Sequence, residues 1–250
     1  MNWRIWIVST LLVAGAQAGQ YGYTDTPWLP GSKWRVHDKD RPEPPKVQPG
    51  APCFSAAPSD AIVLFGGKDL SQWSGVKAAD IEDGSFDIMK TGEIQTKQQF
   101  GDCQLHVEWL IPAKPDGDWT IWGNSGVFLL GLYELQIIET YTYQIYADGI
   151  AGAIYGQTPP LVNVALPPGE WQSYDITFSA PRFDQMGKLH QPAYFTVYWN
   201  GVLVQNHQAA LGPTEHRALA NYSNKTTRGP IKLQNHGSHV HFRNLWIRGQ

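Results

Sequence analysis

Charge is the property in which this sequence is poorest. Only 16% of its 250 residues are charged, and 19 Lys and Arg against 22 Asp and Glu leave a formal net charge of −3. So few scattered cations provide no electrostatic footprint for nucleic acid, and we expect no nucleic-acid partner. The low charge also excludes a coiled coil, and the 42% of hydrophobic residues excludes a disordered chain.

Cysteine is nearly absent as well. The sequence has only Cys53 and Cys103, too few for a zinc site of the usual kind. In an oxidising compartment the economical expectation is one disulfide between them, and two free buried thiols are the alternative. The sequence also lacks an H-E-x-x-H zinc motif, a P-loop and a G-x-S-x-G nucleophile elbow, so none of these chemistries is predicted.

Long hydrophobic runs are missing except at the start of the sequence. Residues 1–18 have Arg4 in a short positive region, an apolar stretch over 5–16, and an Ala-Gln-Ala cleavage site at 16–18. We interpret them as a secretory signal peptide, because a membrane span needs roughly 20 apolar residues; an uncleaved anchor is the alternative. The mature protein is then expected to be secreted or periplasmic, with no membrane anchor after cleavage.

Proline, glycine and aromatic residues are plentiful. The sequence has 25 Gly, 18 Pro, 11 Trp and 11 Tyr, which favours a β-sandwich or barrel over a helical protein. Eight of the prolines lie within residues 19–60. Because proline lacks an amide donor, we interpret 19–60 as an extended arm rather than part of a sheet. Trp28 and Trp34 within it predict that the arm packs against the domain that follows, residues 61–250.

Alternating polar and apolar residues predict the strands of that domain. The clearest patterns lie at 104–109, 133–138, 194–204, 231–236 and 240–247. Within the third, Asn200-Gly201 separates two apolar runs and predicts a hairpin with a type I′ turn. No helix longer than about three turns is predicted. Many short strands with one polar and one apolar face predict two stacked antiparallel sheets.

Polar side chains gather on the non-core sides of these predicted strands. Carboxylates, amides and an imidazole on neighbouring strands would suit acid–base chemistry and the binding of a polyhydroxylated ligand, although a solvated strand face is the plainer interpretation of each residue alone. The residues concerned are Glu108, Glu134, Gln136, Lys232, Gln234 and His236. Trp122, in a loop rich in Gly and Asp, is a candidate platform for stacking on a sugar.

Nine short stretches follow one another along residues 61–248 in the order typical of one family. They are Leu64–Trp73, Ile94–Lys97, Leu105–Trp109, Gly123–Leu129, Tyr133–Ile137, Gly152–Gly156, Gly169–Trp171, Gly229–Gly237 and Val240–Leu245. Each stretch alone is weak evidence, but together and in order they closely resemble the 3-keto-disaccharide hydrolase family. The resemblance implies a concanavalin-A-like jelly roll of two curved antiparallel sheets with a concave ligand face.

The same resemblance implies an enzyme that cleaves glycosides already oxidised to a ketone at C3 of the sugar. A C3 ketone acidifies the C2 proton, so a base can remove that proton and expel the aglycone from C1, after which water adds. Glu134 and His236 are then the best catalytic candidates, one as base and the other as acid or metal ligand, and Glu108 is the third. Binding of hydroxyls or of the enolate oxygen is expected from Lys97, Asn124, Gln136, Gln234 and Arg243.

Four positions depart from the family pattern. Asn235 stands where Asp is usual before His236, which bears on metal binding or on the orientation of the imidazole. Leu130 stands where Arg is common and bears on substrate choice, and Glu139 and Gln172 replace a usual Asp and Asn. No cofactor is firmly implied, although a divalent metal ion that holds the enolate oxygens is compatible with the family chemistry.

Two other functions compete with this one. A non-catalytic, lectin-like carbohydrate-binding domain is the main alternative, because the same fold serves many lectins. A conventional glycosidase is disfavoured, since Glu134 and Glu139 would face opposite sides of a regular strand. In each case the expected partner is an oligosaccharide or glycoside, and no pattern in the sequence indicates an oligomeric state.

Overall fold

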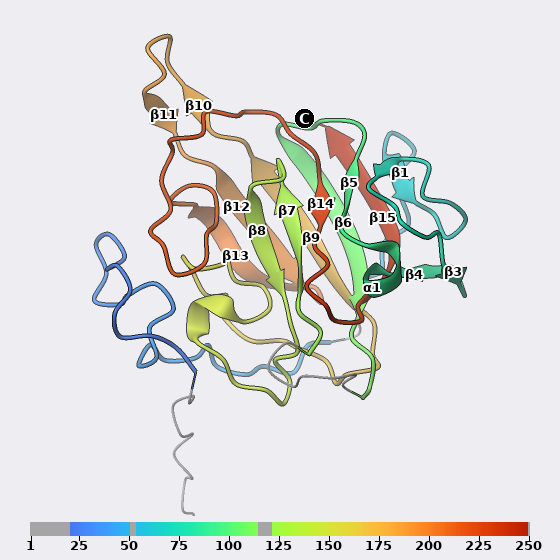
Figure 1. The fold of residues 1–250 in the computed structure, drawn as a ribbon, viewed down its shortest axis with the longest axis horizontal. Coiled ribbons are helices and arrows are strands. Elements are labelled where there is room, and N and C mark those ends of the chain that lie inside the picture. Colours follow the sequence, from blue (N-terminus) through green and yellow to red (C-terminus); the bar gives the residue numbers. More distant parts are fainter. Residues whose placement is uncertain (1–20, 51–53, 115–121, 250) are drawn as a thin grey trace, which may run out of the picture.

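Two stacked antiparallel sheets form the body of the protein (Figure 1). The structure, a computed structural model, describes residues 21–50, 54–114 and 122–249, so the predicted signal peptide and Cys53 lie outside the described residues. Within those ranges, helical structure is limited to the short helix α1 (Ile88–Thr91) and the 3₁₀ turn η2 (Ala147–Gly149). The all-β class predicted from the sequence is confirmed.

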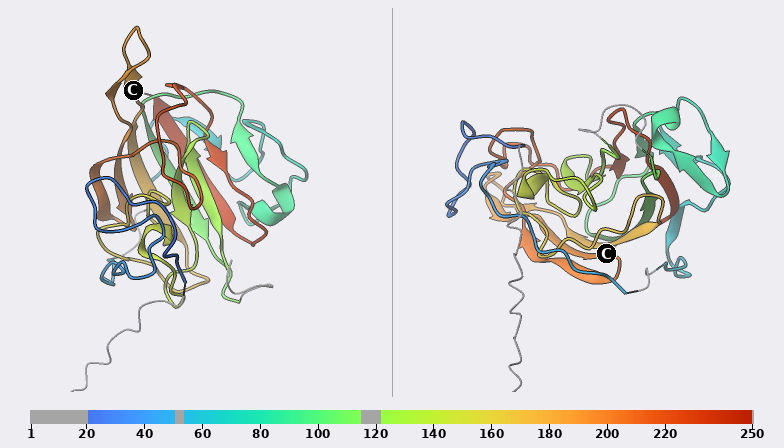
Figure 2. Two further views of the ribbon diagram at one scale, coloured as in Figure 1. Left: turned by 60° about the vertical axis from the view of Figure 1, so that its left-hand side comes forward. Right: turned by 90° about the horizontal axis from the view of Figure 1, so that it is seen from below.

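The larger sheet has eight strands in the order β13-β12-β9-β6-β15-β4-β3, and β1 pairs with β15 beside them. These strands are β1 (Ile62–Phe65), β3 (Ile81–Glu82), β4 (Ser85–Asp87), β6 (Cys103–Leu110), β9 (Gln172–Ser179), β12 (Tyr194–Trp199), β13 (Val202–Ala209) and β15 (His241–Gly249). Figure 2 shows that this sheet is curved.

The smaller sheet has five strands in the order β2-β5-β14-β7-β8. Its members are β2 (Trp73–Ser74), β5 (Ile94–Thr96), β7 (Ser125–Leu129), β8 (Tyr133–Ile137) and β14 (Lys232–Leu233). A separate two-stranded hairpin joins β10 (Arg182–Phe183) to β11 (Leu189–Gln191).

The facing sides of the two sheets form one hydrophobic core. Along β6 and β8 every second side chain is buried in it, as the alternation predicts: Leu105, Val107 and Trp109 from the larger sheet, and Tyr133, Leu135 and Ile137 from the smaller. Burying a side chain of this size contributes about 1.5–3 kcal/mol. The Tyr174 hydroxyl also donates to the Gln136 carbonyl at 2.8 Å, which ties the sheets together across the core.

The hairpin predicted at Asn200-Gly201 is confirmed. β12 and β13 flank these two residues and pair in antiparallel register. Asn200 has φ 49° and Gly201 has φ 77°, the positive values that a type I′ turn requires at both central positions.

The prediction of strict alternation along β15 is wrong at one point. The register against β6 shifts between Arg243 and Trp246, a bulge at which Asn244 adopts φ 46°. The extra residue turns Trp246 to the side of the sheet away from the core, where its ring stacks on His106 with centroids 5.3 Å apart. A single inserted residue therefore exchanges the two faces for the rest of the strand.

The prediction that Glu108 shares a polar face with Glu134 is also wrong. Glu108 lies on the outer face of the larger sheet and is 2% exposed, with Arg243 Nε at 2.6 Å and Asn244 Nδ2 at 2.6 Å. Burial would raise the pKa of Glu108, but hydrogen bonds from His106, Asn244 and Arg243 outweigh it and hold that pKa below its usual value. Alternation places a side chain on one face of its own sheet and leaves open which of two sheets that is.

His106 continues the same polar cluster. Its ring lies 2.7 Å from Asp175 Oδ1 and 3.4 Å from Glu108 Oε1. Burial would lower the pKa of His106, but these two carboxylates raise it to about 9. The charged groups of this cluster therefore compensate one another. The arm covers the cluster, and its Ser55 carbonyl accepts hydrogen bonds from Asn244 and Trp246 at 3.0 Å.

The proline-rich arm packs against the domain, as its tryptophans suggested. Lys46 Nζ donates to the Tyr141 carbonyl at 2.9 Å, and backbone hydrogen bonds of 2.9 Å join Val47 and Pro45 to Asn163. Within the described residues no helix is long and apolar enough to cross a membrane. Cys103 is buried, and burial raises the pKa of its thiol to about 12. Its predicted disulfide partner Cys53 lies outside the described residues, so that pairing stays a prediction.

Replacing Glu108 by Ala should unfold the protein more easily. Its neighbours Arg243, Asn244 and His106 would lose their shared acceptor, and breaking a buried ion pair from one side costs about 3–5 kcal/mol. Urea denaturation would measure the change. The control Asp60→Ala removes the exposed partner of Arg248, 2.6 Å away, and should leave the free energy of unfolding nearly unchanged. Similar small losses in both variants would contradict a structural role for Glu108.

Candidate functional site

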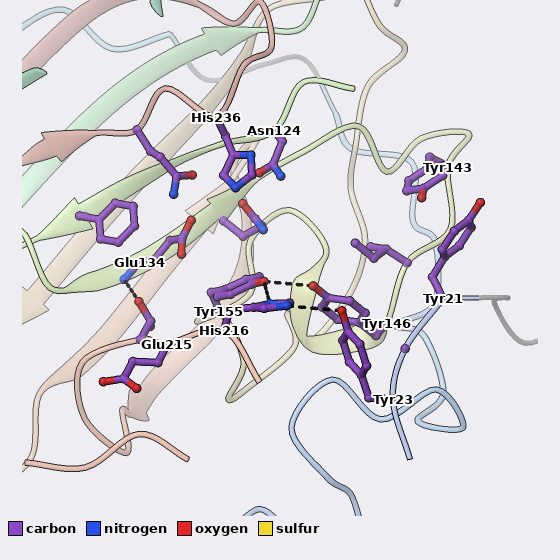
Figure 3. A pocket seen from close by; sticks show the side chains of 16 residues that line it. Tyr21, Tyr23, Asn124, Glu134, Tyr143, Tyr146, Tyr155, Glu215, His216 and His236 are labelled. Carbon is purple, nitrogen blue, oxygen red and sulfur yellow. Dashed lines mark hydrogen bonds between the residues drawn. The ribbon is translucent and has the colours of Figure 1, made fainter. Parts of the chain in front are cut away.

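A pocket of about 690 Å³ lies on the outer face of the smaller sheet (Figure 3). This volume falls within the roughly 300–1,000 Å³ typical of small-molecule sites. Strands β7 and β8, the segments around η2, a loop before β14 and the start of the arm all contribute to it. The lining residues are Tyr21, Gly22, Tyr23, Asn124, Phe128, Glu134, Gln136, Tyr143, Ile145, Tyr146, Tyr155, Thr214, Glu215, His216, Gln234 and His236.

Strand register brings the polar side chains of the pocket floor together. Phe128 of β7 pairs with Glu134 of β8 on one side and with Lys232 of β14 on the other. Two residues along, Gly126 pairs with Gln136, and the Gln234 amide donates to the Gly126 carbonyl at 3.0 Å. Because side chains two apart point to the same face, both rows face away from the core, and Phe128, Glu134, Gln136 and Gln234 line the pocket.

Glu134 is the most perturbed acid of the pocket. It is 6% exposed, and burial raises its pKa to about 8, against a lowering effect of Lys232. The carboxyl lies over Gly126, where a methyl group would come within 2.9 Å of Cγ and 3.0 Å of Cδ. The Glu134 carboxyl can therefore occupy its place in the pocket only because residue 126 is a glycine.

Amide groups surround that carboxyl. Gln136, Gln234 and Asn124 line the same pocket, and each side chain carries both a donor and an acceptor. Oε1 of Gln234 is buried and has no hydrogen-bond partner in the described part of the chain. A buried acceptor of this kind is costly unless it is paired, so it favours a ligand that brings a hydroxyl.

His236 is exposed on the loop that follows β14. Asn235 Oδ1 accepts from the Gly237 amide at 3.0 Å, and its Nδ2 donates to the Met89 carbonyl at 3.3 Å. The Ser238 hydroxyl accepts from the Gly123 amide at 2.7 Å, which fastens this loop beside Asn124. Asn235, where the family usually has Asp, therefore acts on the conformation of the loop, since only an amide can donate to Met89.

The opposite wall of the pocket was not predicted from the sequence. The Tyr155 hydroxyl lies 3.0 Å from that of Tyr146 and 2.8 Å from Nδ1 of His216, and the Tyr23 hydroxyl lies 3.4 Å from Nε2. Burial, and then electrostatic interactions with His37, Arg217 and His236, lower the pKa of His216, while burial raises the pKa of Tyr155. Tyr155 lies in one of the nine family stretches, so the sequence contained a signal that could have indicated it. His216 lies in an irregular loop outside those stretches, and no sequence pattern indicated it.

Four predicted site residues lie elsewhere. Arg243 pairs with Glu108 on the outer face of the larger sheet. Lys97 is exposed at the end of β5, outside the pocket lining. Trp122 is 7% exposed and belongs to the hydrophobic core, which corrects its role as a sugar platform. The pocket thus brings together five of the predicted site residues: Glu134, His236, Asn124, Gln136 and Gln234. Glu108, Arg243, Lys97 and Trp122 lie outside it.

The residues present do not fit a metal ion. In the described ranges, no three His, Cys, Asp or Glu side chains are placed to hold one together. Lys and Arg are likewise missing from the described lining of the pocket, so the site favours a neutral ligand over an anionic one.

Replacing Glu134 by Gln should stabilise the fold at neutral pH. The folded state keeps this proton up to about pH 8, whereas an unfolded Glu loses it near 4.5, so stability falls as pH rises between these values. At pH 7 the free energy of unfolding of the wild type is therefore about 3 kcal/mol lower than that of the variant, whose neutral amide does not ionise. Thermal unfolding should show the variant more stable at pH 7 and equal to wild type at pH 4. A difference that does not depend on pH would contradict the raised pKa.

Known proteins share this architecture. A structure from Parabacteroides distasonis ATCC 8503, described as a predicted glycosyl hydrolase, is 45% identical, with a TM-score of 0.75 over 84% of this chain and 93% of that one. Two further structures from that organism, described in the same way, are 21% and 22% identical with TM-scores of 0.54 and share the fold. They match 76% of this chain and 94% and 99% of their own.

Among curated proteins none matches the chain. A family model described as a 3-keto-alpha-glucoside-1,2-lyase-like domain matches residues 60–248, which include most of the pocket lining. The resemblance noted in the sequence is confirmed, and the fold and pocket agree with a carbohydrate-active protein. The chain belongs to the family of 3-keto-alpha-glucoside-1,2-lyase-like domains.

Proposed function

We propose that this protein is an exported enzyme that cleaves the glycosidic bond of 3-keto-glycosides by elimination, followed by hydration. The observation that supports it best is Glu134, a buried carboxyl with its pKa raised to about 8, set among amides in a pocket of this family. Acids with pKa values moved toward neutrality are typical of general acid–base catalysis. Residues 1–18 support secretion or a periplasmic location.

The reaction needs no covalent bond to the enzyme. A base removes the C2 proton next to the C3 ketone, and the electron pair forms an enolate. As the enolate reverts to the ketone, the pair moves into a C1–C2 double bond and the C1–O bond to the aglycone breaks. An acid protonates the departing oxygen, and water then adds to the double bond to release the 3-keto sugar.

Glu134 and His236 supply the acid and the base. Below about pH 8 the Glu134 carboxyl holds its proton, so it is in the right form to protonate the departing aglycone oxygen. His236, on the loop beside Asn124, takes the C2 proton. The N–H groups of Asn124, Gln136 and Gln234 donate to the sugar hydroxyls and to the enolate oxygen, where negative charge develops.

Incubation of the purified protein with a 3-keto-glucoside and with its unoxidised parent, each with and without chelator, tests this function. We expect aglycone release from the keto substrate alone, and chelator should have no effect, because the pocket residues do not form a metal site. Release from the parent would indicate a conventional glycosidase. Binding of both compounds without turnover of the keto substrate would indicate a lectin-like domain.

Glu134→Gln and His236→Ala should each lower kcat by at least about 100-fold, the usual contribution of one general acid or base. In the wild type, kcat/KM should fall as pH rises through about 8, because Glu134 then loses the proton it must donate. Stopped assays across pH 5–10 would measure both effects. A rate that keeps rising above pH 8 would assign Glu134 as the base, and full activity in both variants would remove these residues from the mechanism.

Gly126→Ala should displace the Glu134 carboxyl without unfolding the sheet. The new methyl would lie within 3.0 Å of Cγ and Cδ of Glu134, and a shift of about 1 Å can reduce turnover about 100-fold. Gly50→Ala is the matched control, because a methyl there meets no atom within 4 Å. Equal activity of the two variants would show that the position of Glu134 does not matter.

A further inference from the structure

The N-terminal arm supplies part of the pocket wall. Tyr21, Gly22 and Tyr23 line the pocket, although they precede the family domain by nearly forty residues. At Gly22, which has φ 141°, a side chain would come within 2.8 Å of the Lys39 backbone nitrogen. The arm is therefore folded tightly at this point, with one tyrosine on each side of the glycine.

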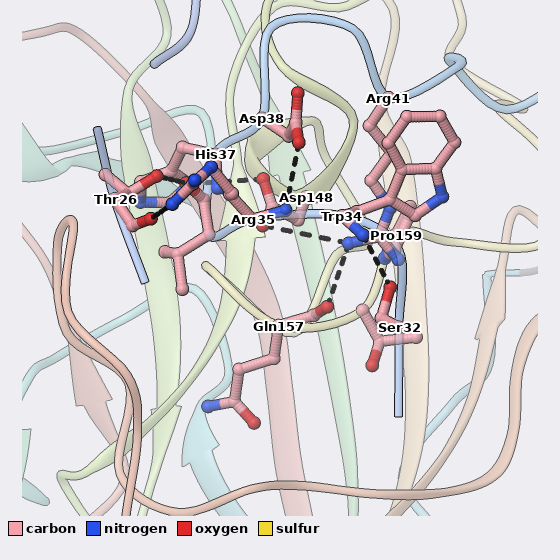
Figure 4. Close-up of polar contacts among 12 residues, drawn as sticks. Thr26, Ser32, Trp34, Arg35, His37, Asp38, Arg41, Asp148, Gln157 and Pro159 are labelled. Atoms are coloured by element: carbon pink, nitrogen blue, oxygen red, sulfur yellow. Dashed lines mark hydrogen bonds and ion pairs between the residues drawn. The ribbon is translucent and has the colours of Figure 1, made fainter. Parts of the chain in front are cut away.

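A buried contact between His37 and Asp148 anchors the arm beside the pocket (Figure 4). His37 of the arm and Asp148 of η2 are both fully buried, and Asp148 accepts from the His37 amide at 3.0 Å and lies 3.1 Å from its Nδ1. The His37 carbonyl accepts from the Tyr23 amide at 2.8 Å. Fixing His37 therefore also fixes Tyr23.

The arm tyrosines meet tyrosines of the domain. The rings of Tyr21 and Tyr143 have centroids 5.5 Å apart, and those of Tyr23 and Tyr146 are 6.1 Å apart. Tyr143 is held by Glu139, whose carboxylate accepts from the Tyr143 amide at 2.8 Å and from the Tyr141 amide at 2.7 Å. Glu139 is thus a structural carboxylate of this wall, not a partner of Glu134.

Figure 3 shows the pocket with two chemically different ends. Glu134, His236 and Asn124 lie on one side, and Tyr21, Tyr23 and Tyr143 lie on the other. Resting on the proposed function, we propose that the arm builds the subsite of the leaving group, and that this group is a neutral ring stacked on the tyrosines. Aromatic faces bind sugar rings and aromatic rings alike, and the described lining offers no Lys or Arg to an anion.

The test compares Tyr21→Ala with wild type on three pairs of ligands. These are a disaccharide, a phenyl glucoside and a methyl glucoside, each as the 3-keto substrate and as the unreactive parent. For Tyr21→Ala we expect KM to rise about tenfold for the 3-keto disaccharide, the phenyl 3-keto-glucoside or both, with kcat nearly unchanged. The affinity for the corresponding unoxidised parent glycoside should fall by the same factor. The methyl compounds, which have no ring to stack, should be unaffected, and the pattern across the first two pairs identifies the ring.

Tyr198→Ala is the matched control. Tyr198 on β12 is 44% exposed against 42% for Tyr21, and it does not line the pocket. His37→Ala, which releases the anchor of the arm, should reproduce the Tyr21→Ala pattern. Because Tyr21 is exposed, its replacement should leave the fold intact even if the loss of His37 does not.

Equal losses for all three ligand pairs, or no change for any, would overturn the arm subsite. The parent glycosides separate this outcome from failure of the proposed reaction, because their binding requires no turnover. If wild type leaves every 3-keto substrate intact yet Tyr21→Ala weakens the parent disaccharide or phenyl glucoside alone, the proposed reaction fails and the subsite stands.

Discussion

The pairing of β14, β7 and β8 is the constraint on which the rest of the structure depends. These three strands turn one face to the core and place Lys232, Phe128 and Glu134 in a row on the other. A shift of one residue would send Glu134 into the core and Leu135 to the ligand. The stability of the sandwich and the geometry of the pocket are therefore set by the same register.

Two buried glutamates show how the surroundings decide what a carboxylate does. Glu108 is surrounded by donors, and its pKa is held low, so it remains charged and structural. Among the described residues, only Lys232 acts to lower the pKa of Glu134, and burial outweighs it and raises that pKa to about 8. Keeping Glu134 in this environment lowers stability at neutral pH, the kind of trade-off common where a site needs a perturbed group.

The arm changes the shape of the site rather than its chemistry. The family domain supplies Glu134, His236 and the amides of the pocket, whereas the arm adds aromatic surface at the far end of the same pocket. The His37–Asp148 pair makes this addition rigid, because both side chains are buried and Asp148 accepts from the His37 amide and lies 3.1 Å from its Nδ1. In the proposed mechanism, this element outside the family domain alters which leaving groups fit without altering the reaction.

Much of this protein could be inferred from the sequence alone. Period-two alternation predicted the core faces of β6 and β8, Asn200-Gly201 predicted a type I′ hairpin, and ordered family stretches indicated Glu134, His236, Asn124, Gln136 and Gln234. These signals are local, because the faces of a strand and the residues of a turn depend on near neighbours in the chain.

Only the tertiary structure decided the rest. It separated Glu108 and Arg243 from the pocket, exchanged the faces of β15 at a bulge, and brought His216, Tyr23 and Tyr155 together from three distant segments. Such placements depend on which sheet a strand joins and on which loops meet above it. Those contacts link residues far apart in the chain, and no local pattern of side chains encodes them.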